Sequence, residues 1–170
     1  MLVVVSGLPG VGKTTVARAL ARATGAVHIR IDSIEQALRN AGQRVEAEGY
    51  VVAYAIAEDN LRLGRMVVAD CVNPWPLTRR DWRSVADRAG AVIVDVEIVC
   101  SDLDEHRRRV ERREPDIEGQ TLPTWSEVMQ RDYRAWDEER LVIDTARSSP
   151  EESVRLILST LFSDREDEAS

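Results

Sequence analysis

The stretch GLPGVGKTT at residues 7–15 constrains this chain of 170 residues more than any other feature. Gly7, Gly12, Lys13 and Thr14 occupy the fixed positions of the pattern G-x-x-x-x-G-K-[ST]. A short apolar run over residues 2–5 precedes the loop and indicates a buried strand, and residues 13–24 carry apolar side chains near helical spacing. A strand, a glycine loop and a helix in this order form a cradle whose backbone N–H groups and helix N-terminus face a phosphate. The loop therefore predicts that the protein binds a nucleoside triphosphate.

The residues of this loop have expected parts in holding the nucleotide. Lys13 should reach the β- and γ-phosphates, and the Thr14 hydroxyl should help to hold Mg²⁺. The predicted nucleotide-binding residues of the loop are Gly7, Leu8, Pro9, Gly10, Val11, Gly12, Lys13, Thr14 and Thr15.

Length and composition indicate a single globular domain. Hydrophobic residues make up 44% of the chain and charged residues 31%, as in ordinary soluble proteins. We expect one domain over residues 1–163 and a disordered polar tail over 164–170. The sequence shows no basic-then-apolar leader and no apolar run of about 18 residues, so we expect no membrane span and a cytoplasmic location. The net charge of −7 makes nucleic acid an unlikely main partner, because phosphate backbones require a basic surface.

Strand-like and helical stretches alternate along the chain. This alternation predicts an α/β protein with a parallel sheet that is covered by helices on both faces. The predicted strands span residues 2–5, 27–31, 66–71, 91–100 and 141–143. The predicted helices span residues 13–24, 33–41, 50–64, 78–89, 102–113, 125–136 and 150–162, and residues 114–123 should form a loop.

Two aspartates stand at the carboxyl ends of predicted strands, where ligands bind in open parallel sheets. Asp32 follows the second strand and is our candidate general base, because phosphoryl transfer to an alcohol needs an acceptor for the hydroxyl proton. The alternative role for Asp32 is a helix cap, in a capping box with Glu35, although Ser33 and Gln36 offer a second such box. Asp70 ends the third strand and is the candidate acid that supports Mg²⁺, directly or through water.

A basic stretch, HRRRVERR at residues 106–113, lies in the second half of the chain. Arg109 and Arg113 are four residues apart and share one face of the predicted helix. A lid around residues 102–125 would neutralise the triphosphate and exclude water, and one planar guanidinium would lie flat on the adenine ring. The alternative is a solvated helix whose arginines pair with neighbouring carboxylates.

These stretches, together with RIDSIEQALR, VVADCVNPWPLTRRDW and LPTWSEVMQRDYRAWDEERLVIDTA, resemble the small P-loop kinases of the nucleoside monophosphate kinase type. More narrowly, the chain is similar to the AAA-type ATPase/kinase group related to chloramphenicol phosphotransferase, zeta toxins and gluconate or shikimate kinases. The resemblance covers residues 2–146. It implies a three-layer P-loop NTPase fold with a five-stranded parallel sheet in the order 2-3-1-4-5 and a small lid. It also implies ATP and Mg²⁺ as cofactors.

The resemblance carries over to particular residues. Asp32 matches the acid that contacts the acceptor hydroxyl, Arg109 and Arg113 match lid arginines at the adenine and the phosphates, and Ala146 falls near the adenine-binding loop. One position departs from the pattern, because shikimate kinases have a second acid two residues before the base and this chain has Arg30 there. Metal support then falls to Thr14 and Asp70.

The leading functional prediction is an ATP-dependent kinase that moves the γ-phosphate to a hydroxyl group of a small molecule. Asp32 would act as the base, and Lys13 and Arg113 would stabilise the transferring phosphoryl group. One alternative is a kinase that acts on a nucleotide, a nucleotide sugar or a nucleic acid end. A second alternative, from another class, is a nucleotide-binding switch or ATPase without an acceptor. The sequence leaves the acceptor open among sugars, antibiotics and amino alcohols, and we expect a monomer or a homodimer.

Overall fold

The computed structural model describes the backbone of residues 1–167 and the side chains of residues 1–161. Within these residues, five strands form one parallel sheet in the order β2-β3-β1-β4-β5, which confirms the predicted order. The strands are β1 (Leu2–Ser6), β2 (Val27–Arg30), β3 (Val67–Asp70), β4 (Ile93–Val99) and β5 (Leu141–Asp144).

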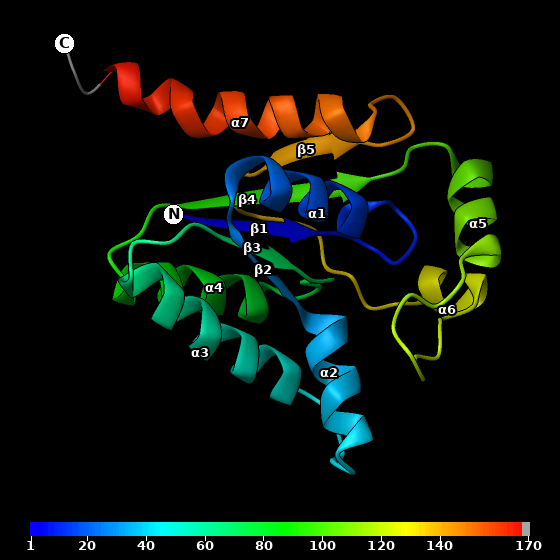
Figure 1. Ribbon diagram of the computed structural model, residues 1–170. Helices are drawn as coiled ribbons and strands as arrows, with labels where there is room; N and C mark the ends of the chain where they lie inside the picture. Colours follow the sequence, from blue (N-terminus) through cyan, green and yellow to red (C-terminus); the bar gives the residue numbers. More distant parts are fainter. Residues whose placement is uncertain (168–170) are drawn as a thin grey trace.

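Helices cover both faces of this sheet (Figure 1). Helices α1 and α7 lie on one face and α3 and α4 on the other, while α5 and α6 lie beyond the end to which the strands point (Figure 1). The helices are α1 (Lys13–Thr24), α2 (Ile31–Asn40), α3 (Glu48–Arg62), α4 (Pro76–Arg88), α5 (Leu103–Arg112), α6 (Trp125–Met129) and α7 (Pro150–Asp167). None of these helices is both long enough and apolar enough to cross a bilayer.

Two apolar layers hold the sheet between the helices. Alternate residues of β1 point to opposite faces, so Val3 and Val5 pack with α1 and α7, while Leu2 and Val4 pack with α3 and α4. All four side chains are fully buried, which is expected of a central parallel strand covered on both sides. The strand that leads into the phosphate loop is thus buried along its whole length.

The predicted helix over residues 125–136 is wrong in its second half, because α6 ends at Met129. The fully buried Arg79 of α4 accounts for the difference. Its guanidinium donates to the carbonyl oxygens of Arg134 and Ala135, at 2.6 and 2.9 Å, and lies 4.0 Å from the centre of the Trp136 ring. In a helix the Arg134 N–H would donate to the carbonyl oxygen of Gln130, but here it donates to that of Pro74 at 2.8 Å, so the chain takes an irregular path beside Arg79.

At the other end of the chain, α7 continues to Asp167, five residues beyond the predicted end. The expected tail over 164–170 therefore begins inside a helical stretch of backbone. Residues 168–170 lie outside the described residues.

Candidate active site

The phosphate loop lies between β1 and α1, as predicted. Two of its glycines occupy positions that leave no room for a side chain. Gly10 has a φ of +84°, and a Cβ there would approach the Val110 Cγ2 atom of α5 to 2.4 Å. A Cβ on Gly7 would lie 2.4 Å from the carbonyl oxygen of Ile98 in β4. The loop is thus pressed between β4 and α5, and larger residues would push it out of place.

A cleft of about 360 Å³ opens beside this loop. Its cationic side chains outnumber its carboxylates, which suits a triphosphate. It is lined by Gly10, Gly12, Lys13, Thr14, Thr15, Arg18, Arg109, Arg112, Arg113, Glu114 and Asp116. Four of the predicted loop residues do not line this cleft: Gly7, Leu8 and Val11 pack within the fold, and Pro9 lines a second cavity.

Helix α5 is docked directly on the phosphate loop. The ring of the buried His106 lies with its Nε2 atom 2.8 Å from the Pro9 carbonyl oxygen, and its edge meets the ring of Trp125. Val110, one turn further on, covers Gly10. The first part of the predicted lid is therefore packed against the nucleotide site, and His106 is a contact that sequence reasoning did not assign.

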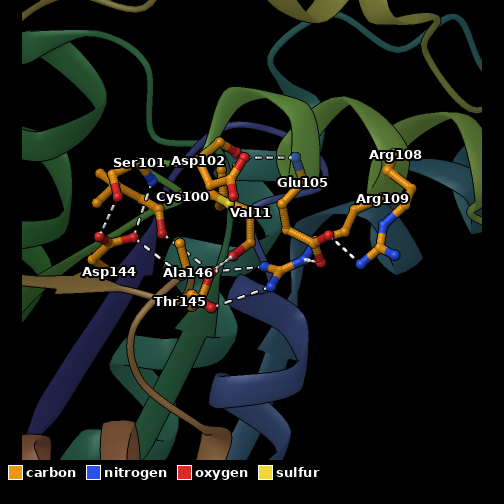
Figure 2. Close-up of polar contacts among 11 residues, drawn as sticks. Val11, Cys100, Ser101, Asp102, Glu105, Arg108, Arg109, Asp144, Thr145 and Ala146 are labelled. Atoms are coloured by element: carbon orange, nitrogen blue, oxygen red, sulfur yellow. Dashed lines mark hydrogen bonds and ion pairs between the residues drawn. The ribbon is translucent and has the colours of Figure 1, made fainter.

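Arg109 lines the cleft and contacts Thr145, the neighbour of Ala146 in the chain (Figure 2). The Arg109 guanidinium donates to the Thr145 hydroxyl and carbonyl oxygens, at 2.9 and 3.2 Å, and to Glu105 at 2.7 Å. The Thr145 hydroxyl in turn donates to the carbonyl oxygen of Val11 in the phosphate loop, at 2.6 Å. A guanidinium donates within its own plane, so these three hydrogen bonds do not use its flat face. The Ala146 N–H donates to Asp144 at the end of β5, which places Ala146 in the same cluster.

Two other arginines of α5 follow the solvated alternative. Arg107 and Arg108 are exposed and pair with Glu111 and Glu105 on their own helix. One face of α5 thus carries ordinary surface ion pairs, and the other borders the cleft.

Asp70 is buried at the end of β3, close to the start of α1. Burial opposes ionisation, but interactions with His28, Lys13 and Thr14 hold the pKa of Asp70 below its ordinary value. Its Oδ2 atom lies 3.5 Å from His28 Nε2 and has no hydrogen-bond partner among the described residues. An ionised, buried acceptor beside Thr14 fits a cation, directly or through water.

The donor set also fits Mg²⁺ in particular. No cluster of three or more His, Cys, Asp or Glu side chains able to hold a metal occurs in the described part of the chain. Thr14 and Asp70 are the two residues predicted to hold the ion. Mg²⁺ suits such a sparse set, because it usually keeps several waters and binds through one or two carboxylates and the substrate phosphates.

Asp32 lies in the first turn of α2, and neither predicted capping box forms. The helix begins at Ile31 with Arg30 as its N-cap, and no side chain caps it. The helix starts two residues earlier than predicted, which moves Asp32 and Ser33 inside the first turn. The Asp32 side chain is 29% exposed, and its Oδ2 atom is 3.7 Å from the Nη2 atom of Arg30. The carboxylate is therefore available to a ligand.

Asp32 lines a second and larger cavity of about 620 Å³. The cavity lies between α2, α3, the start of α4 and residues 119–123, and its floor includes the rings of Tyr50 and Tyr54. The two tyrosine hydroxyls are engaged by backbone groups of Asn73 and Thr78, so the rings present apolar surface. Lys13 and Arg113 line both this cavity and the phosphate cleft, and so mark the place where the two meet.

Comparisons with known proteins agree with this architecture. Residues 2–133 match the AAA domain family. No curated protein matches the chain. Among solved structures, the Mycobacterium tuberculosis APS kinase CysC in complex with AMPPNP and APS has a TM-score of 0.71 at 20% identity, over 95% of this chain and 97% of that chain.

Two further structures are similar at the level of the fold. A gluconokinase from Sinorhizobium meliloti 1021 has a TM-score of 0.64 at 20% identity and covers 99% of this chain and 97% of its own. Chaetomium thermophilum Kti12 in complex with ADP-AlF3 has a TM-score of 0.63 at 22% identity, with coverage of 95% and 97%. Together with the phosphate loop and the strand order, these matches confirm the resemblance drawn from the sequence: the chain belongs to the AAA domain family and has the P-loop kinase fold.

Proposed function

We propose that this protein is an ATP-dependent kinase that transfers the γ-phosphate to a hydroxyl group of a small molecule. The observation that carries the proposal is the junction of two cavities at Lys13 and Arg113. A phosphate bound in the smaller cavity would point toward a ligand in the larger one. A nucleotide switch needs only the first cavity.

Each side chain has a defined part in this proposal. Lys13 and Arg113 stabilise the phosphoryl group in transit, because both reach the junction. Asp32 orients the acceptor hydroxyl and takes up its proton. Arg109 stacks on adenine beside Ala146. Thr14 and Asp70 would hold Mg²⁺, which neutralises phosphate charge when bound.

The larger cavity also bears on the acceptor. Its volume of about 620 Å³ suits a ligand of ordinary drug or metabolite size. A nucleotide or nucleotide sugar remains the second candidate acceptor. A nucleic acid end is disfavoured by the net charge of −7.

Asp32→Asn separates the kinase from the switch. A general base typically raises the reaction rate by ~10²- to 10⁴-fold. Acceptor-dependent ADP release by the variant should therefore fall by at least about 100-fold. ATP affinity should be unchanged, because the side chain lines the acceptor cavity alone. The matched control is Asp59→Asn, an equal change at an exposed position of α3. ADP release that no hydroxyl compound in a broad panel accelerates, or an Asp32→Asn variant with more than about a tenth of the wild-type rate, would contradict the proposal.

A further inference from the structure

One buried guanidinium lies among three carboxylates of the candidate site. Arg30, the last residue of β2, is only 4% exposed in its side chain. Its Nη1 and Nη2 atoms donate to Asp116 at 2.8 and 3.0 Å. Nη2 is also 3.7 Å from Asp32, and Nε is 3.8 Å from Asp70. Every nitrogen of Arg30 thus faces a carboxylate, in the fork geometry that suits arginine.

Asp116 belongs to a segment that borders both cavities. We call residues 113–123 the wall segment. Its first part, Arg113, Glu114 and Asp116, lines the phosphate cleft, while Arg113 and residues 119–123 line the larger cavity. The segment contains neither helix nor strand. Its position therefore depends on side-chain contacts.

The contacts of Asp116 are the strongest candidates for holding that position. Beyond the paired bonds from Arg30, its carboxylate accepts a bond from Arg18 of α1 at 2.8 Å and lies 3.5 Å from Arg113. The hydrogen bonds from Arg30 outweigh partial burial and hold the pKa of Asp116 well below its ordinary range. Asp116 is therefore ionised at neutral pH. Arg18 is 44% exposed, so its pairing is weak, and the buried fork of Arg30 is the main anchor.

We propose that Arg30 is a positioning residue, which fixes the wall segment through Asp116 while it holds Asp32 and Asp70 in place. With the wall segment in this position, Arg113 stands at the junction of the cavities. The kinetic consequence rests on the function proposed above. The placement of the wall segment does not rest on that function, and it can be measured without any acceptor.

The first experiment measures the wall segment directly. Trypsin cleaves after Arg112 and Arg113, which lie where α5 runs into the wall segment. Asp116→Asn removes the charged partner, and Arg30→Lys keeps the positive charge but loses the fork. Each variant should be cleaved there roughly tenfold faster than wild type, between the effects of exposed and buried pairs. Glu118→Gln is the control, because it removes an exposed carboxylate of the same segment that no described residue pairs with.

The double variant tests whether the two residues act together. Asp116→Asn combined with Arg30→Lys should be cleaved no faster than either single variant, because one contact is lost in all three. Wild-type cleavage of Asp116→Asn would overturn the proposal. The proposal would also be overturned if the increase in cleavage rate of the double variant equalled the product of the two single increases. Arg30→Lys also guards against misfolding, since it retains the charge beside the buried Asp70.

The second experiment distinguishes positioning from stability alone. With an acceptor found by the ADP-release screen, each single variant should have a lower kcat and a higher acceptor KM than wild type. Its kcat/KM should fall about tenfold. The dissociation constant for ATP, from calorimetry, should change less than about threefold. A lowered thermal midpoint with unchanged kcat and KM would reduce Arg30 to a structural role. If wild type shows no acceptor-dependent turnover, the proposed kinase function fails, while the cleavage rates still decide whether Arg30 holds the wall.

Discussion

Asp95, in the middle of β4, offers a quantitative test of the electrostatics of this fold. Its side chain is 1% exposed, and its Oδ2 atom lies 2.6 Å from Arg83 Nη2. Burial raises the pKa of Asp95 to about 6, against the opposing charge of Arg83, and the negative charge of Glu138 adds to the rise. The folded protein therefore binds this proton more tightly than the unfolded chain, in which an aspartate has its ordinary pKa of 3.8.

The sign and size of the effect follow from linkage. Because the folded-state pKa is the higher one, the stabilising contribution is fully present below about pH 4 and is lost as the pH rises through about 6. The gap between 3.8 and about 6 corresponds to about 3 kcal/mol in the free energy of unfolding. Asp95→Asn cannot ionise, so it should escape this loss. At pH 7.5 it should be more stable than wild type by up to about 3 kcal/mol.

Urea unfolding at pH 4 and pH 7.5 measures this difference. The two proteins should be close at pH 4 and diverge at pH 7.5, and Asp87→Asn, at an exposed position of α4, should follow wild type at both. An Asp95→Asn variant that is less stable than wild type at pH 7.5 would refute the reasoning. It would mean that the ion pair with Arg83 outweighs the cost of burying the charge.

Three further predictions concern the nucleotide site. Lys13→Ala should abolish ATP-dependent phosphorylation without loss of fold, and wild-type turnover by a folded variant would contradict its role at the phosphates. Arg113→Ala should lower kcat more than it weakens ATP binding, whereas Arg109→Ala should mainly weaken ATP binding; steady-state kinetics beside calorimetry would reveal a reversed pattern. Gly10→Ala should weaken ATP binding, because the added Cβ would lie 2.4 Å from Val110, and unchanged affinity by calorimetry would mean that α5 yields without moving the loop.

The elements of the fold were predictable because their signals are local. A fully buried parallel strand such as β1 is a continuous apolar run, and α1 follows a motif with fixed positions. The helix predicted over residues 125–136 failed for a non-local reason. Its pattern of apolar residues is helical, but the N–H of Arg134 bonds to Pro74 and its carbonyl group bonds to Arg79, and both partners lie more than fifty residues earlier. The sequence of residues 125–136 alone does not predict these contacts.

The candidate site divides in the same way. Asp32 and Asp70 could be placed at the carboxyl edge of the sheet, because the ends of parallel strands meet there. The capping boxes predicted around Asp32 failed, since the helix starts earlier than its sequence signals suggest. Arg30 and Asp116 were not assigned at all. They are 86 residues apart, and an arginine at a strand end or an aspartate in a loop is unremarkable until the fold joins them.

The contacts of Arg79 have a consequence for how related sequences can differ. All four of its side-chain hydrogen bonds, to Asn73, Pro74, Arg134 and Ala135, end on carbonyl oxygens, which every amino acid possesses. Drift at those four positions therefore leaves the anchor intact, provided that the backbone path is kept. Position 79 has no such freedom, because lysine lacks the fork that reaches several carbonyls at once. Homologues should therefore vary freely along this irregular stretch while they retain one arginine, about fifty residues away, that shapes it.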